Sequence, residues 1–308
     1  MIDLHMHSSA SDGSDSIPEL LACLQKAGID TFAVTDHDTI DGAVEMETAT
    51  RALNLHYIKG IEFSCVTPLR KCHLLGYRYD ANDPVFLSAI REGNDLRLAK
   101  LERRLAFLQE TYHVEFTDEE LAWLHSQKSP GKPHLADLLL KRGIGKSRDD
   151  IIQNYFRGAD ANYTAKISPA GSDSNYAGSN PDRMIEENHQ KDRDRIAART
   201  AISGILHAGG IPVWAHPLGG EGERLLTEHE FKEQLQYLIR QGLGGLECHY
   251  SRYNEEQVLF LRAQAVKHDL LISGGSDYHG TRKTIALGTL NAYGAPVSEE
   301  ELTILQEL

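Results

Sequence analysis

Short apolar runs alternate with helix-like stretches along most of this chain, and that alternation limits the folds open to it. Seven apolar runs are expected to form strands, at residues 2–5, 31–35, 55–58, 72–77, 211–215, 245–248 and 270–273. Helical patterns separate several of these runs, at residues 17–27, 42–53, 197–208, 228–241 and 254–268. Strands that alternate with helices favour an α/β fold built on a parallel sheet or barrel, in which active sites gather at the carboxyl ends of the strands.

The stretch from residue 89 to residue 196 interrupts this alternation. Helical periodicity at residues 90–112, a capping box at residues 117–120, and short helical patterns at 134–142 and 148–156 indicate a mostly helical insertion. Residues 168–180 are rich in Ser, Gly, Asn and Asp, which is typical of a flexible loop, and a lid over the site is the alternative. The sequence therefore predicts a discontinuous barrel of residues 1–88 and 197–292, the insertion at 89–196, and a C-terminal tail or helix at 293–308.

Composition and charge narrow the class of protein and of partner. The 308 residues are 41% apolar and 25% charged, which is ordinary for a soluble globular protein. The chain shows no run of about 20 apolar residues, no signal-peptide pattern and no C-x-x-C pair, so we expect a cytoplasmic protein without a membrane partner. A net charge of −13 without a basic stripe argues against long nucleic acid as a partner, although local cations can still bind a small phosphate.

Imidazole and carboxylate side chains stand at the ends of six of the seven predicted strands. His5 and His7 are two residues apart, so an extended backbone points both to one face. The other groups are Asp12 in the loop after them, His37, Glu62, His73, His216, Asp277 and His279. A single such residue is ordinarily a turn, cap or core residue. Burial of so many charges at one end of a barrel would be costly, and a cluster of bound cations would compensate that cost.

These residues resemble the motifs of the polymerase and histidinol phosphatase (PHP) family, in order and on both sides of the insertion. The motifs are His5-Met6-His7, Ser11-Asp12-Gly13, Thr35-Asp36-His37-Asp38, Gly60-Ile61-Glu62, Ala215-His216-Pro217 and Ser276-Asp277-Tyr278-His279. The resemblance implies a distorted (β/α)7 barrel that binds two or three divalent metals and hydrolyses phosphate esters. It implies a first metal on His5, His7, Glu62 and Asp277, a second on Asp12, His37 and His279, and a third on Glu62, His73 and His216. Such ligands, without thiolate, suit manganese, iron or zinc.

Three residues are candidates for contact with the substrate. The segment Gly131-Lys132-Pro133-His134 resembles one that helps bind the substrate's phosphate in the small-molecule branch of the family. Many relatives have Arg in place of Lys132, and lysine supplies a point charge but not a bidentate fork. A surface position at a helix N-terminus is the alternative for His134. His249 follows Glu247 by two residues, so we expect both on one face, where His249 could protonate a leaving group or contact a phosphate. His249 and Asp277 are the predicted catalytic residues. For His249, the alternative is a position behind the metal ligands, without contact to the substrate.

The predicted activity is hydrolysis of a small phosphate ester by a metal-bridged hydroxide, since the sequence offers neither a G-x-S-x-G elbow nor a P-loop. Residues 131–136 and 271–277 are most similar to the branch that opens phosphoribosyl 1,2-cyclic phosphate and releases phosphate. The alternative is a nucleoside 3′,5′-bisphosphate 3′-phosphatase or a short-RNA 5′ exonuclease. A histidinol phosphatase and a non-catalytic polymerase-accessory module are weaker alternatives. The expected partner is a small phosphorylated substrate, and the sequence does not indicate an oligomeric state.

Overall fold

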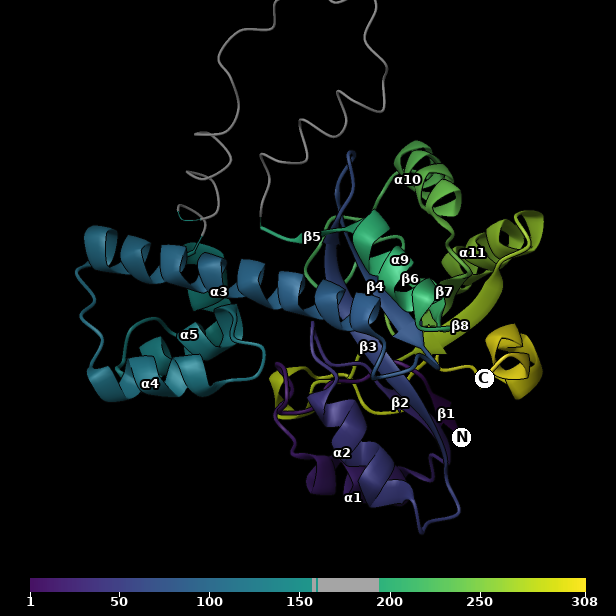
Figure 1. Ribbon diagram of the computed structural model, residues 1–308, viewed down its shortest axis with the longest axis horizontal. Helices are drawn as coiled ribbons and strands as arrows, with labels where there is room; N and C mark the ends of the chain where they lie inside the picture. Colours follow the sequence, from purple (N-terminus) through teal and green to yellow (C-terminus); the bar gives the residue numbers. More distant parts are fainter. Residues whose placement is uncertain (157–158, 160–193) are drawn as a thin grey trace, which may run out of the picture. The chain divides into compact units, whose positions relative to one another are not determined.

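The computed structural model describes residues 1–156, 159 and 194–308, which are coloured in Figure 1. The chain forms two compact units, the first made of Met1–Gly93 with Ile196–Leu308 and the second of Asn94–Arg195. The loop predicted at residues 168–180 lies outside the described residues.

One eight-stranded sheet forms the core of the first unit. Its path in chain order is β1 (Ile2–Asp3), β2 (Thr31–Val34), β3 (His56–Val66), β4 (Lys71–Tyr77), β6 (Ile211–Ala215), β7 (Gly245–Tyr250) and β8 (Leu271–Gly275), with β5 (Ile196–Ala197) paired to β3. The sheet is nearly closed. Leu4 donates its N–H to the carbonyl of Gly274 at 3.2 Å, and Asp277 donates its N–H to the carbonyl of His5 at 2.8 Å. The predicted α/β fold with a barrel-like sheet is confirmed.

The fourth strand runs in the opposite direction to its neighbours. The pairs β1–β2 and β2–β3 are parallel, as are β6–β7 and β7–β8, whereas β4 is antiparallel to both β3 and β6. β4 therefore departs from the parallel arrangement that the alternation of strands and helices predicts, because a short turn rather than a helix joins β3 to β4. This reversal places His73, in the first half of β4, opposite Ser64 and Ala215, at the edge where the neighbouring strands end.

Five helices lie within the first unit, and three of them begin at a standard N-cap residue: Ser16, Thr227 or Asn254. The five helices are α1 (Ile17–Ala27), α2 (Asp41–Thr50), α9 (Ala198–His207), α10 (Glu228–Gln241) and α11 (Glu255–Lys267). In α10, Glu230 donates its N–H to Thr227 Oγ1 at 3.3 Å, while Thr227 donates its N–H to Glu230 Oε2 at 2.9 Å, and Gly242 ends the helix with a φ of 101°. Because these signals are local, the residue pattern alone places the helices within a few residues of their observed bounds.

The C-terminal segment packs onto the sheet. Leu302 and Ile304 are buried, and Ile272 of β8 donates its N–H to Thr303 Oγ1 at 2.9 Å. Two short 3-10 helices, η2 (Glu299–Glu301) and η3 (Thr303–Gln306), form this segment. Residues expected to be a tail therefore complete the packing beside β8.

The second unit is helical in its described part. Helix α3 (Pro84–Tyr112) begins in the first unit and continues into the second, where α4 (Asp118–Ser126), α5 (Lys132–Lys141) and α6 (Arg148–Asn154) follow. Leu101, Leu108, Leu124, Leu135 and Ile151 belong to a buried apolar cluster within this unit. In the part of the chain that the structure describes, no helix is both long enough and apolar enough to cross a membrane.

Candidate metal centre

All the predicted metal ligands lie in the first unit and converge on one carboxylate. Glu62 is 1% exposed and stands at the centre of the group. Its Oε2 lies 3.1 Å from His7 Nε2, 3.3 Å from His5 Nε2 and 3.2 Å from His37 Nδ1, and its Oε1 lies 2.8 Å from His73 Nδ1 and 3.2 Å from His216 Nε2. The sequence argument from strand ends therefore identifies groups that do meet in space.

Two further carboxylates complete the cluster. Asp277 Oδ1 lies 3.4 Å from His7 Nε2 and 3.6 Å from His5 Nε2, and Asp12 Oδ1 lies 3.3 Å from His279 Nε2. Candidate ligand atoms within 4.8 Å of one another form three overlapping groups: His7, Asp12, His37 and His279; His5, His7 and Asp277; and His37, Glu62 and His73. Because His7 and His37 each belong to two groups, the division into three metal sites stays a prediction.

The ligand atoms are arranged to bind divalent cations and are not satisfied by hydrogen bonds among themselves. Among the described residues, Asp12 Oδ1 and His37 Nδ1 are buried without a hydrogen-bond partner, and His5 Nε2 lies 3.3 Å from His7 Nε2. Buried polar atoms left in this state are costly unless something else satisfies them. Imidazole and carboxylate donors gathered around one point are the ligand set that first-row divalent metals take in proteins. The residues present therefore fit the metal ions that the sequence predicts.

The electrostatics of the cluster favour bound cations. Burial favours neutral carboxyls, yet the imidazoles of His37 and His5 hold the pKa of Glu62 well below its usual range. Burial also disfavours charged imidazole, but Asp277 and Glu62 outweigh it and raise the pKa of His7 to about 9. In contrast, burial lowers the pKa of His279. The low pKa of Glu62 favours its carboxylate form, and a divalent metal bound to His7 would displace a proton from that imidazole.

Sharp backbone turns bring the ligands inward at the strand ends. Asp277 and His216 have φ values of 60° and 30°, in the left-handed region that residues with a side chain rarely adopt. Buried aspartates hold the loops that carry other ligands. Asp36 accepts hydrogen bonds from Ser8 N–H at 2.8 Å and Ser8 Oγ at 2.6 Å, and Asp3 accepts one from Ser276 N–H at 2.9 Å. These aspartates serve the loops and not the metals.

Three residues outside the predicted set contact the ligands. Glu247 Oε1 lies 2.8 Å from His5 Nδ1, and its Oε2 accepts the N–H of His216 at 2.6 Å, which fixes the ring of His5 with Nε2 toward the cluster. Tyr250 Oη and Lys283 Nζ both donate to Asp277 Oδ2, at 2.9 and 2.7 Å. Glu247 has a sequence signal, a carboxylate on a predicted strand, whereas Lys283 lies in a loop and has none.

The same-face expectation for His249 is wrong. A β-bulge between Glu247 and His249 shifts the register of β7 against β8, so the side chains two residues apart do not share a face. The charged neighbours of His249 are Glu301 and Arg262, and both of its ring nitrogens are buried without a hydrogen-bond partner. Burial lowers its pKa to about 4. Tyr250, the next residue, reaches Asp277 instead.

Lys132 and His134 belong to the second unit, at the first turn of α5. His134 is 2% exposed, its Nδ1 accepts the N–H of Gly131 at 3.2 Å, and its ring lies 6.0 Å from that of Trp123. The alternative of a surface position for His134 is therefore wrong, since it is a buried residue that caps its own helix. Contact of Lys132 or His134 with a substrate stays a prediction.

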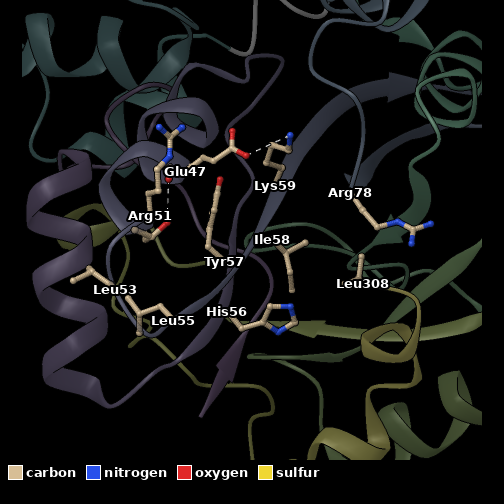
Figure 2. Close-up of a pocket in the computed structure, with 11 residues that line it drawn as sticks. Glu47, Arg51, Leu53, Leu55, His56, Tyr57, Ile58, Lys59, Arg78 and Leu308 are labelled. Atoms are coloured by element: carbon tan, nitrogen blue, oxygen red, sulfur yellow. Dashed lines mark hydrogen bonds and ion pairs between the residues drawn. The ribbon is translucent and has the colours of Figure 1, made fainter.

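A hollow of about 340 Å³ is lined in part by residues of α2 and the start of β3 (Figure 2). Its lining includes His56 at the start of β3, Arg78 just after β4, and Glu47 of α2, which pairs with Lys59 at 3.6 Å. None of the predicted site residues lines this hollow. This hollow is therefore separate from the cluster of candidate metal ligands.

A nearly closed α/β sheet with an imidazole and carboxylate cluster at its edge defines the class of metal-dependent hydrolases. The PHP domain family model matches residues 3–169, more than half of the chain, so the protein belongs to the PHP domain family. A solved structure from Bifidobacterium adolescentis, described as a metal-dependent phosphoesterase, has a TM-score of 0.74 and 26% identity, with 99% of this chain and 96% of that chain covered.

Curated relatives agree on the reaction class. The chain is 27% identical to the phosphoribosyl 1,2-cyclic phosphate 1,2-diphosphodiesterase of Eggerthella lenta, over 90% of this chain and 94% of the relative. It is 23% identical to the 3′,5′-nucleoside bisphosphate phosphatase of Chromobacterium violaceum, over 90% and 87%. It is 28% identical to a 5′-3′ exoribonuclease of Haemophilus influenzae, over 93% and 92%. The protein is therefore a hydrolase, a metal-dependent phosphoesterase, as the sequence predicts.

Proposed function

We propose that this protein hydrolyses a small cyclic sugar phosphate of the phosphoribosyl 1,2-cyclic phosphate type and releases phosphate. The observation that carries the proposal is similarity to the Eggerthella lenta diphosphodiesterase along 94% of its length, together with the largely buried cluster of imidazoles and carboxylates in the first unit. Lys132 in place of the Arg of many relatives, and a net charge of −13, favour a small substrate over an RNA end.

We propose as metal ligands the residues that converge in the cluster: His5, His7, Asp12, His37, Glu62, His73, His216, Asp277 and His279. Divalent cations there would supply an acidified water and positive charge beside the phosphoryl oxygens. The protein's own groups prepare the site for this chemistry. Glu247 orients His5, and Tyr250 with Lys283 takes one oxygen of Asp277 so that the other faces His5 and His7.

The alternative substrates are a nucleoside 3′,5′-bisphosphate and the 5′ end of a short RNA. Similarity to the Chromobacterium violaceum phosphatase and to the Haemophilus influenzae exoribonuclease supports this alternative, at identities of 23% and 28%. All of these substrates present a phosphate ester to the same cluster. The choice among them therefore depends on groups that contact the rest of the substrate, for which Lys132 and His134 are our candidates.

Phosphate release from a panel of compounds tests the proposed substrate. The panel contains phosphoribosyl 1,2-cyclic phosphate, a nucleoside 3′,5′-bisphosphate, a short 5′-phosphorylated RNA and histidinol phosphate. We expect the highest kcat/KM for the cyclic phosphate. A higher value for the bisphosphate or the RNA would replace our proposal with the alternative, and equal values for all compounds would refute the idea that the insertion selects the substrate.

The variant His7→Ala tests the proposed metal ligands. We expect turnover to fall by at least about a hundredfold and the metal content of the purified protein to fall with it. His229→Ala is the matched control, because the side chain of His229 is 83% exposed and pairs only with Glu233 at 3.7 Å among the described residues. A fully active His7→Ala protein that holds no metal would contradict the proposal.

A further inference from the structure

Beyond its hydrogen bond to Asp277, Lys283 is a partly buried cation with no assigned contact to the substrate. It follows the short helix η1 (Gly280–Arg282), and its side chain is 19% exposed. Its Nζ donates to Asp277 Oδ2 at 2.7 Å. An ammonium held against a carboxylate at the edge of a candidate phosphoesterase site needs an explanation, because burial of a lysine is costly and a well-placed cation is what phosphate recognition requires.

The two oxygens of Asp277 face different surroundings. Oδ1 lies 3.4 Å from His7 Nε2 and 3.4 Å from His279 Nδ1, among the candidate metal ligands. Oδ2 accepts hydrogen bonds from Tyr250 Oη at 2.9 Å and from Lys283 Nζ at 2.7 Å. Lys283 therefore stands on the opposite side of Asp277 from the ligand nitrogens, and it is more exposed than His7, whose side chain is 0% exposed. Lys283 is thus more accessible to solvent than the imidazole ligands behind Asp277.

The hydrogen-bonding capacity of Lys283 exceeds the contacts of its ammonium with described residues. An ammonium has three N–H donors, and the hydrogen bond to Asp277 uses one of them. The second carboxylate nearby, Glu221, lies 3.9 Å away, beyond hydrogen-bond distance, and it also pairs with Arg252. Tyr250 would still hold Asp277 Oδ2 if Lys283 turned part of its donors to another anion. The interaction with Asp277 therefore leaves N–H donors of Lys283 for a second anion.

We propose that Lys283 binds a non-bridging oxygen of the substrate's phosphate, and so sets the preference of the site for an anionic phosphoryl group. A phosphate beside Asp277 would accept one or two of the remaining N–H donors, with a charge-assisted bond that a neutral residue could not replace. The role rests on the proposed function only in taking a phosphate ester as the substrate. It does not depend on which sugar or nucleoside carries that phosphate.

The test measures binding of inorganic phosphate to the full-length, metal-loaded protein by titration calorimetry, together with metal content by elemental analysis. We expect Lys283→Met to weaken phosphate binding by at least about tenfold with unchanged metal content, and Lys283→Arg to recover part of the affinity. Lys267→Met is the charge-matched control, since it removes an ammonium at the end of α11. Phosphate binding by Lys283→Met at the affinity of the wild type would overturn the proposal.

Tyr250→Phe separates phosphate binding from positioning of Asp277. It removes the other donor to Asp277 Oδ2 but keeps the cation. If Lys283 only positions Asp277, both variants will lose metal to a similar extent, and that result overturns the proposal. If Lys283→Met does not fold, the Lys283→Arg and Tyr250→Phe proteins provide the test. A change in phosphate affinity of Lys283→Arg at unchanged metal content is expected only if Lys283 contacts the phosphate. Should the cyclic phosphate fail as a substrate while Lys283 variants still lose affinity for inorganic phosphate, the proposed function falls and this inference stands.

Discussion

His249 shows how strongly one buried side chain can couple stability to pH. Both of its ring nitrogens are buried without a hydrogen-bond partner, so the folded protein accepts the neutral imidazole far more easily than the charged one. Burial lowers its pKa from 6.5 to about 4, with a small opposing effect from Glu301 and a supporting one from Arg262. Between these two values the unfolded chain binds a proton that the folded protein does not, so stability falls as the pH falls from about 6.5 to about 4.

We therefore expect the wild type to lose up to about 3 kcal/mol more free energy of unfolding than His249→Gln between pH 7 and pH 4. Urea unfolding of both proteins across that range, at a fixed metal concentration, measures the difference. Comparison of the two proteins cancels the titration of the metal ligands, which both retain. Parallel curves for the two proteins would mean that His249 is not held neutral in the folded state.

The close approach of β8 to the segment after β1 requires a residue without a side chain at position 275. A Cβ at this position would lie 2.2 Å from His5 Cβ and 2.5 Å from the backbone nitrogen of His5. Backbone atoms on the facing strand cannot move aside as a flexible side chain could. The near closure of the sheet and the position of His5 in the cluster therefore both depend on the absence of a side chain at residue 275.

Gly275→Ala should lower the free energy of unfolding by about 1–3 kcal/mol and reduce metal content, because the added methyl pushes β1 and His5 outward. Gly209→Ala is a suitable comparison. A Cβ there meets nothing within 4 Å, and its cost comes only from a φ of 73°. Thermal unfolding and elemental analysis distinguish the two variants. If Gly275→Ala keeps the metal content of the wild type, the close approach does not control the cluster.

The sequence predicts elements well where the cause lies within a few residues. The helix caps at Thr227 and Gly242 and the polar residues at strand ends are local patterns, so the helices and the convergence of His5, His37 and Glu62 follow from them. The central place of Glu62 follows only from the family resemblance, which implies Glu62 as a ligand of two metals, because its contacts come from several strands that are far apart in the chain.

Other features depend on partners distant in sequence, and no local pattern reveals them. The direction of β4 depends on its pairing with β3 and β6, and the bulge in β7 depends on its register against β8. Spacing by two residues therefore fails at His249 although it holds at His5 and His7. No sequence pattern predicts the contact of Lys283 with Asp277, since only the folded chain brings the two together.

At the scale of the molecule, the candidate metal centre brings together residues from near the start of the chain and from beyond its last strand. Its residues run from His5, just after β1, to His279, beyond β8, and they come from strand ends all along the sheet of the first unit. The second unit has an apolar cluster of its own and contributes none of the proposed metal ligands. Bound cations should therefore stabilise the first unit by holding together segments that are far apart in sequence, and the folding of the second unit should depend on them much less.

Removal of metal should lower the melting temperature of the first unit. Cations that bind only the folded protein stabilise it by about 2.7 kcal/mol at a hundred times their Kd, which corresponds to roughly 5–10 °C for a domain of this size. Scanning calorimetry with and without a chelator measures the shift, and hydrogen exchange shows which unit loses protection. His7→Ala should respond much less to the chelator, because it has already lost the imidazole that two of the ligand groups share. An equal shift in His7→Ala and the wild type would mean that the chelator acts somewhere other than this cluster.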